Sequence, residues 1–264
     1  MKKLLILCLL LLVGGCMRND SYPLDNFSPE QKVLVKAIQK GDLDQVKVLI
    51  PKTNLNLWKK DSIPLLTAAF IDAIPDKAND NITPRLQIVT ELMRGGAPFT
   101  VTAGFPESPL GIALAQEHPA FLKAMLEGGL DPNYQQEGAT IIFDTLSNRK
   151  LELVKLLVKS GANIEFKSSA TGGETPAYSA MWGIAPRVSW YLVSIGANTN
   201  VMNAFGTRSF AMATYIAEKD LLESIARIKA GGEGDLNALQ EDLDAVQKVK
   251  AVMIERGQEW PPKK

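Results

Sequence analysis

The chain has 264 residues, 46% of them apolar and 22% charged, and its 29 basic and 29 acidic side chains balance. An apolar fraction of this size, in a chain of this length, can bury a core without help from disulfides. No block of Lys or Arg stands out, which argues against binding to a nucleic-acid backbone or polybasic attachment to a membrane.

The first residues have the organisation of a secretory signal peptide. Lys2 and Lys3 provide a positive start, an apolar run covers residues 4–13, and small residues follow before Cys16. The apolar run is about half the length that spans a bilayer as a helix. The sequence therefore predicts export, with residues 1–15 removed and a net charge of −2 left by 27 basic and 29 acidic side chains.

The last four residues of this segment, Val13-Gly14-Gly15-Cys16, resemble the lipobox of bacterial lipoproteins. The resemblance implies that Cys16 is acylated, that residues 16–29 are the lipidated cysteine and a tether, and that the protein is anchored in the periplasm. Met17 stands where an aspartate tends to retain lipoproteins in the inner membrane, so the resemblance favours the outer membrane. The alternative is simple cleavage to a soluble periplasmic protein. Cys8 lies in the discarded segment, so neither cysteine is left for a disulfide, a nucleophile or a metal.

A pattern that ends a helix recurs four times along the rest of the chain. Each copy closes on a glycine, and the glycines at 96, 129, 161 and 196 are 33, 32 and 35 residues apart. A second landmark keeps a similar spacing, in Ser108-Pro109-Leu110, Thr140-Ile141-Ile142, Thr175-Pro176-Ala177 and Arg208-Ser209-Phe210. Two landmarks with one period predict a repeat architecture.

Each repeat reads as two short helices. Thr175 offers an N-cap hydroxyl before Pro176, whose fixed φ suits a first helical turn. Apolar residues at 151, 154, 157 and 158 form one stripe on a second helix, and Gly161 follows where a left-handed cap favours glycine. Neither helix can bury its apolar face alone, so stacked copies are expected to share a core.

The outer repeats are less regular. Residues 34–50 predict an N-terminal helix pair, and residues 63–97 a second pair with an inserted loop at 72–83, after which Thr83-Pro84 starts a helix. Residues 211–230 are expected to form a sixth pair, and residues 236–256 a final helix with a charged face. The repeats are thus assigned to 30–232, and a C-terminal capping helix and tail to 233–264.

The repeats resemble the ankyrin family through Ser108–Ala113, Leu151–Ala162, Thr175-Pro176-Ala177 and Gly196-Ala197-Asn198. The resemblance implies an all-α solenoid of about six helix-turn-helix units joined by short hairpin loops. The family's usual histidine in its Thr-Pro-Leu-His stretch is replaced here by Gly111, Phe143, Tyr178 and Ala211.

A search for catalytic chemistry gives little. His118 is the single histidine and precedes Pro119 at a turn between helices, where a surface or capping role is expected. The acidic residues Asp42, Asp44, Glu241, Asp242 and Asp244 are interpreted as helix-start and solvated charges rather than general acids or bases. We therefore expect no enzyme, no cofactor and no metal site.

Binding is the remaining class of function. The ankyrin resemblance implies a concave surface made by hairpin tips and first helices, and bulky side chains are expected on it. The candidates for contact with a protein partner are Phe99, Phe105, Tyr134, Phe166, Tyr178, Trp182, Met202 and Phe205. The alternative for each is packing against the adjacent repeat.

Three functions follow. The leading hypothesis is an immunity protein that inhibits a secreted antibacterial effector, such as a phospholipase delivered by type VI secretion, and it is drawn from lipoproteins that this chain resembles. The second is a periplasmic scaffold for envelope proteins and enzymes. The third is an enzyme with cation ligands at Asp72, Asp76 and Asp80, whose spacing matches no calcium loop.

Overall fold

The computed structural model describes residues 22, 24–57, 63–74, 83–102, 107–203 and 205–263. The predicted signal peptide and Cys16 lie outside the described residues. The chain divides into two compact units, residues 1–131 and residues 132–264.

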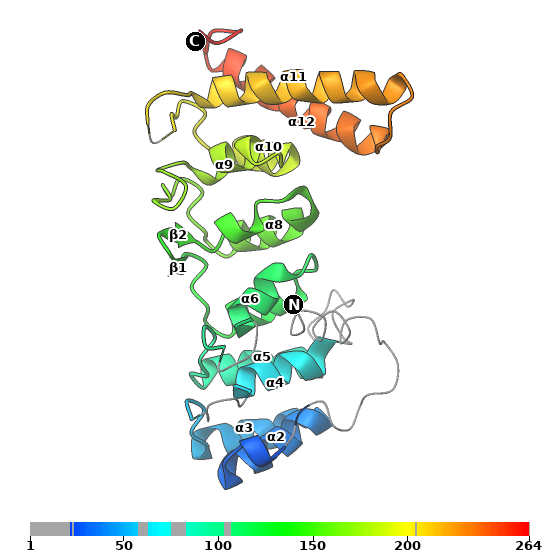
Figure 1. The fold of residues 1–264 in the computed structure, drawn as a ribbon. Helices are drawn as coiled ribbons and strands as arrows, with labels where there is room; N and C mark the ends of the chain where they lie inside the picture. The colour runs from blue at the N-terminus through cyan, green and yellow to red at the C-terminus, as the bar shows by residue number, and fades with distance from the viewer. Residues whose placement is uncertain are drawn as a thin grey trace. The chain divides into compact units, whose positions relative to one another are not determined.

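The first unit contains three helix pairs, preceded by a short 3-10 turn (Figure 1). The pairs pack so that each helix contacts its partner and the neighbouring pair. The elements are η1 (Leu24–Asn26), α2 (Pro29–Lys40), α3 (Leu43–Leu49), η2 (Ile50–Lys52), α4 (Leu65–Ala73), α5 (Pro84–Arg94), α6 (Pro109–Ala115) and α7 (Ala120–Glu127).

Hydroxyl caps and prolines start three of these helices. The hydroxyls of Ser28, Thr83 and Ser108 each accept a hydrogen bond from the backbone N–H three residues later, and a proline follows each cap. The capping oxygen satisfies an N–H that has no partner within the helix, and proline lacks the N–H that would be left over. The predicted starts at Thr83-Pro84 and Ser108-Pro109 are confirmed.

The core of the first unit includes a stacked aromatic pair. Phe70 on α4 and Phe121 on α7 are both fully buried, with ring centroids 5.0 Å apart and planes 15° apart. Burying two such rings contributes several kcal/mol through apolar area and ring contact. The unit therefore has an apolar core of its own.

Part of the predicted tether belongs to this folded unit. Tyr22 and Phe27 are buried, with their ring centroids 6.0 Å apart, and the Tyr22 hydroxyl donates a hydrogen bond to Asp72 on α4. The predicted tether at residues 16–29 is therefore part of the packed fold at Tyr22 and Phe27. The physical reason is that two aromatic rings have a large apolar surface, and burying that surface against the fold is favourable.

The two glycines that end α7 have different roles. Gly129 has φ +101°, a backbone conformation that side chains rarely adopt, and open space lies where its Cβ would be. Gly128 has an ordinary φ, but a Cβ there would lie 2.5 Å from Cβ of Met93 and 3.0 Å from the carbonyl oxygen of Thr90, both on α5. Gly128 therefore lets adjacent helix pairs approach, and Gly129 turns the chain.

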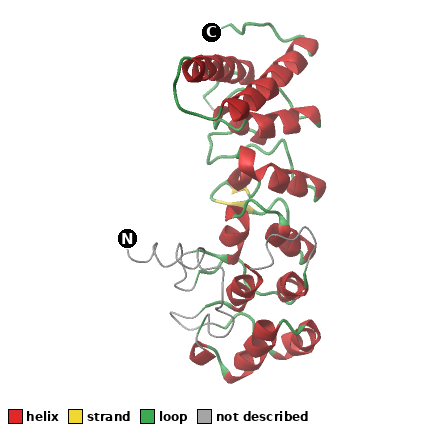
Figure 2. Cartoon of the chain, turned by 90° about the vertical axis from the view of Figure 1, so that its right-hand side faces the viewer, coloured by secondary structure: helices red, strands yellow, loops and turns green. Residues whose placement is uncertain are grey.

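The second unit also contains three pairs, the first of them reduced, and a small two-stranded sheet (Figure 2). Strand β1 pairs antiparallel with β2, with Gln135 opposite Thr140. The elements are β1 (Gln135–Gln136), β2 (Ala139–Thr140), η4 (Phe143–Thr145), η5 (Asn148–Lys150), α8 (Leu151–Lys159), α9 (Pro176–Trp182), α10 (Pro186–Ser194), α11 (Phe210–Lys229) and α12 (Leu236–Glu255).

Two predictions fail in this unit. The residues 211–230 form the single helix α11 rather than a pair, and α11 packs side by side with α12, so that α12 completes the last pair (Figure 1). Thr175 stands at the N-cap of α9, but its hydroxyl makes no capping hydrogen bond and is buried without a partner.

Within each unit the described residues nevertheless form three packed pairs, which confirms the predicted all-α fold of helix-turn-helix units. The landmark glycines 96, 129, 161 and 196 all have positive φ, as their position at helix ends predicts. No helix among the described residues has the length and apolar content needed to cross a membrane.

Candidate protein-binding surface

Three of the predicted contact residues are exposed in the second unit. Trp182 ends α9 and is 46% exposed, while Met202 (46%) and Phe205 (83%) lie on the loop between α10 and α11. Large apolar side chains are normally exposed singly, so several on and beside one loop mark a candidate interface.

The other candidates lie elsewhere. Tyr178 is 1% exposed and belongs to the core, so its expected contact with a partner is wrong. Phe166 is half-buried and meets Phe143 edge to face at 6.4 Å, as packing within the stack predicts. Phe99 and Tyr134 are half-buried, and Phe105 lies outside the described residues.

The loop that carries Met202 and Phe205 is a hairpin held by its own backbone. Met202 and Ser209 form an antiparallel bridge, and the Asn203 N–H donates to the carbonyl of Arg208 at 2.9 Å. The Asn203 side-chain oxygen accepts hydrogen bonds from the backbone N–H of Thr207 (3.0 Å) and Arg208 (3.2 Å). An asparagine that bonds to nearby backbone in this way fixes a turn.

Tyr178 packs against the base of this hairpin. Its ring packs on Phe210 at 5.8 Å, and its hydroxyl donates to the carbonyl oxygen of Arg208 at 3.4 Å. Burial, with a smaller contribution from the negative charge of Glu174, raises the pKa of Tyr178 above its ordinary value. The phenol therefore stays protonated and keeps its donor at neutral pH.

The Arg208 side chain lies over the exposed Trp182. The guanidinium carbon is 4.2 Å from the centre of the indole ring, within the range of a cation–π contact. We refer to Trp182, Met202, Phe205 and Arg208 together as the hairpin surface. Their positions are fixed by α9 and by a hydrogen-bonded loop, so little conformational entropy is lost when a partner binds.

Arg208 is a member of this surface that the pattern of bulky apolar residues does not predict. In the sequence it stands out only as part of a repeat landmark, directly before Ser209, where the preceding repeat has Glu174 before Thr175. A basic residue directly before a hairpin's closing serine is the signal that was present, but its contact with Trp182 comes from the tertiary fold.

A second feature of this unit is an open groove of about 400 Å³ bounded by α8, α10 and α12. Trp190 and Tyr191 line it beside charged side chains, among them Lys155 and Lys248. Lys248 lies 5.9 Å from the centre of the Trp190 ring and also pairs with Asp244.

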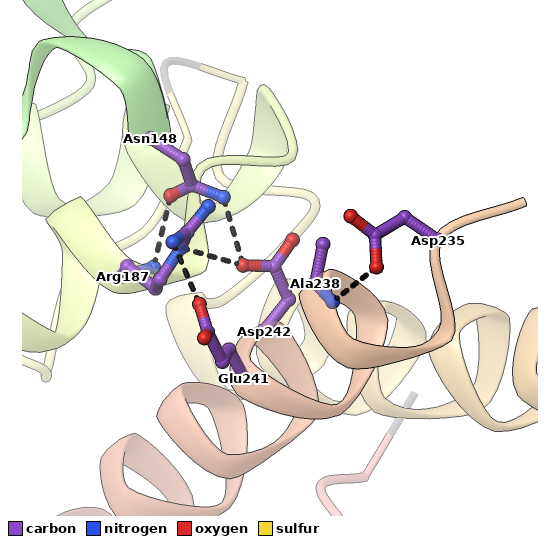
Figure 3. Close-up of polar contacts among 6 residues, drawn as sticks. All are labelled: Asn148, Arg187, Asp235, Ala238, Glu241 and Asp242. Atoms are coloured by element: carbon purple, nitrogen blue, oxygen red, sulfur yellow. Dashed lines mark hydrogen bonds and ion pairs between the residues drawn. The ribbon is translucent and has the colours of Figure 1, made fainter.

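A polar network joins α10 and α12, and two of its members, Arg187 and Glu241, also line the groove (Figure 3). Arg187 pairs with Glu241 and with Asp242, each at 2.9 Å, and Asn148 both donates to Asp242 and accepts from the Arg187 backbone N–H. Asp242 was expected on a solvated face, but it is buried, because α12 packs on α10. Burial raises its pKa, and the Arg187 charge opposes that shift.

The remaining candidates for chemistry have structural roles. The His118 ring nitrogen Nδ1 accepts a hydrogen bond from the Ala120 N–H at the start of α7, which confirms the capping prediction. Asp42 caps α3 by accepting from the Gln45 N–H. Within the described ranges, no group of three or more His, Cys, Asp or Glu side chains is placed to hold a metal ion. Asp72 is hydrogen-bonded to Tyr22, and its predicted companions Asp76 and Asp80 lie outside those ranges.

Comparison with known proteins returns fold neighbours of low identity. No protein-family model matches the chain, and no curated protein matches it in sequence. Among solved structures, EF0377, an ankyrin repeat protein, is 18% identical with a TM-score of 0.48, over 74% of this chain and 93% of that one. The ankyrin repeat domain of Bcl-3, a member of the IkappaB family, is 19% identical with a TM-score of 0.43, over 69% and 92%. With TM-scores below 0.5 and identities below 20%, this similarity does not indicate a function for the chain.

Proposed function

We propose that this chain binds a protein partner through the hairpin surface. The observation that carries the proposal is Phe205, which is 83% exposed on a loop whose backbone is fixed by internal hydrogen bonds. An aromatic ring this exposed buries little apolar area within the fold, whereas rigid aromatic and arginine side chains dominate binding energy at interfaces.

The role we propose for this binding is inhibition in the bacterial periplasm. The support comes from residues 1–16, which resemble an export signal with a lipidation site, and from repeats that resemble those of ankyrin proteins. A lipid-anchored binder at the outer membrane would block a secreted effector such as a phospholipase by covering the mouth of its active site. Such an immunity protein needs no catalytic residue of its own.

The test is a purification of the tagged chain from the envelope of its native host, with mass spectrometry of the proteins that accompany it. One stoichiometric hydrolase, inhibited by the purified chain, is the expected result. Phe205→Ser should lose that protein, whereas Val48→Ser, which changes an exposed apolar residue on α3, should retain it. Several housekeeping envelope proteins in place of one effector would indicate a scaffold instead.

The anchor is tested separately. Cys16→Ala should move the chain from the membrane fraction to the soluble fraction, since acylation at that sulfur would be lost. Unchanged fractionation would overturn the lipid anchor but would leave protein binding by the hairpin surface intact.

A further inference from the structure

Arg208 is the one member of the hairpin surface that carries a charge. Its guanidinium lies on the Trp182 ring and makes no ion pair or hydrogen bond with any side chain in the described ranges. Two other arginines of the same unit have polar partners: Arg187 contacts Glu241 and Asp242, and Arg256 donates to the carbonyl of Ala197. The planar guanidinium of Arg208 is therefore held against the Trp182 indole, while its N–H groups remain available to donate hydrogen bonds to a ligand.

This arrangement favours an anion with two oxygens in one plane. Guanidinium presents parallel N–H groups that match a carboxylate, and stacking on an aromatic ring holds the fork in one orientation before binding. Arg208 is half-buried, which reduces its solvation and strengthens an ion pair relative to one in open water.

The neighbours of Arg208 define the rest of the ligand. Met202 and Phe205 stand on the same hairpin and expose apolar side chains, and Trp182 exposes the part of its ring that Arg208 leaves open. A ligand that covers this surface must therefore present apolar side chains beside its negative charge. An acidic residue flanked by apolar residues on a protein segment meets both requirements.

We infer that the partner inserts an aspartate or glutamate side chain against Arg208, with an apolar residue of the same segment on Phe205 and Met202. This inference rests on the proposed function, since it names the partner chemistry that the hairpin surface recognises. A protein carboxylate is favoured over an anionic lipid headgroup because attachment to a charged bilayer needs several cations, and the hairpin surface has one.

The probe is a phage library of random twelve-residue peptides, selected on the full chain purified in detergent. The selected peptides are expected to place Asp or Glu next to a large apolar residue. The best peptide and its twin with Gln in place of Glu are then titrated, and the acidic form should bind about tenfold or more tightly. Vesicles with and without phosphatidylglycerol form the second arm.

Matched variants assign the effect to the guanidinium. Arg208→Gln should remove the preference for the acidic peptide, and Arg208→Lys should restore part of it, because a lysine keeps the charge but not the fork. Lys159→Gln, on α8, makes the same change in net charge and should alter nothing. Thermal melting of each variant checks the fold, which Arg208→Gln should preserve because the Tyr178 hydroxyl donates its hydrogen bond to the backbone carbonyl of residue 208.

The outcomes separate the inference from the proposed function. Selected peptides that lack acidic residues, or that bind Arg208→Gln equally well, would overturn the carboxylate and leave protein binding standing. A chain that selects no peptide and is sedimented only by phosphatidylglycerol vesicles would overturn both. An acidic preference that depends on Arg208 and is weakened by added salt supports the inference.

Discussion

The phenol oxygen of Tyr22 lies 2.6 Å from Oδ2 of Asp72, to which it donates a hydrogen bond across 50 residues of sequence. The tyrosine is buried, and burial is the largest cause that raises its pKa well above the ordinary value, so it stays a donor throughout the neutral range. The contact fastens the segment before α2 to α4. Residue 22 is only six positions after Cys16, so an anchor at that cysteine would hold the first unit within about 20 Å of the lipid.

Tyr22→Phe should lower the free energy of unfolding by about 1–2 kcal/mol, because the half-buried Asp72 carboxylate loses its donor while the ring is kept. Urea denaturation followed by circular dichroism measures the change. Asp25→Asn is the control in the same segment, since it breaks an exposed pair with Lys32 and should have almost no effect. Equal losses in the two variants would contradict a specific role for the Tyr22 hydroxyl.

Asp72 also makes stability depend on pH. Burial raises its pKa above the ordinary 3.8, although the Tyr22 hydroxyl and the Arg85 charge oppose the shift. A group whose pKa is raised by folding contributes stability that is complete below 3.8 and is lost as the pH rises through the raised value. The free energy of unfolding of Asp72→Asn, relative to that of the native chain, should therefore be highest at pH 7. The difference should fall as the pH is lowered to 4, because the native carboxyl becomes protonated. Denaturation curves across that range would refute the assignment if the difference between the two proteins stayed constant.

Arg187→Ala should cost about 1–3 kcal/mol of unfolding free energy, because it leaves the buried Asp242 without its cation. The expected loss is smaller than for a fully buried ion pair, because the Arg187 side chain is 35% exposed and water screens its charge. The double variant with Asp242→Asn should recover part of the loss. Lys155→Ala, which removes an exposed pair with Glu152, should change stability little.

The two glycines after α7 should respond in opposite order to the same substitutions. At Gly129, Asn should be tolerated better than Ala, because asparagine adopts positive φ more readily. At Gly128, Ala should cost about 1–3 kcal/mol and Asn more, because any side chain meets Met93 and the α5 backbone. Thermal melting of the four variants provides the measurement, and the same order at both positions would contradict the two separate roles.

Ile184 is a β-branched residue with φ +62° in the turn between α9 and α10, and it is 76% exposed. A left-handed conformation costs a branched side chain about 1–2 kcal/mol, and little burial offsets that cost here. Ile184→Gly should raise the free energy of unfolding by about 0.5–1 kcal/mol after the extra chain entropy of glycine is counted. Ile184→Val, which stays branched, should not. A loss of stability in the glycine variant would mean that the Ile184 side chain packs more favourably than its exposure indicates.

The repeat fold could be read from the sequence where its signals are local. Thr83-Pro84, Ser108-Pro109 and the positive-φ glycines each depend on a few neighbouring residues, so they mark helix ends whatever the tertiary packing. The pair predicted for 211–230 failed because the repeat period was extended into a stretch with neither Gly nor Pro to interrupt a helix. The first helix of the fourth repeat is reduced to the 3-10 turn at 143–145, where the landmark lacks its proline.

The candidate surface could be read only in part. Bulky residues were found by type, but type alone does not distinguish the exposed Trp182 from the buried Tyr178 one turn earlier on the same helix. Arg208 and the Tyr22 contact depend on chain segments that meet only in the folded protein. The burial of Asp242 likewise follows from the packing of α12 on α10, which no local pattern near residue 242 encodes.

The hairpin at 201–210 keeps its shape through Asn203 and its backbone, not through Phe205 or the charged end of Arg208. The side chains that we propose to meet a partner are thus separate from those that fold the loop. If the tip meets a partner as proposed, substitutions at Phe205 would change the partner that is recognised while leaving the fold of the loop intact.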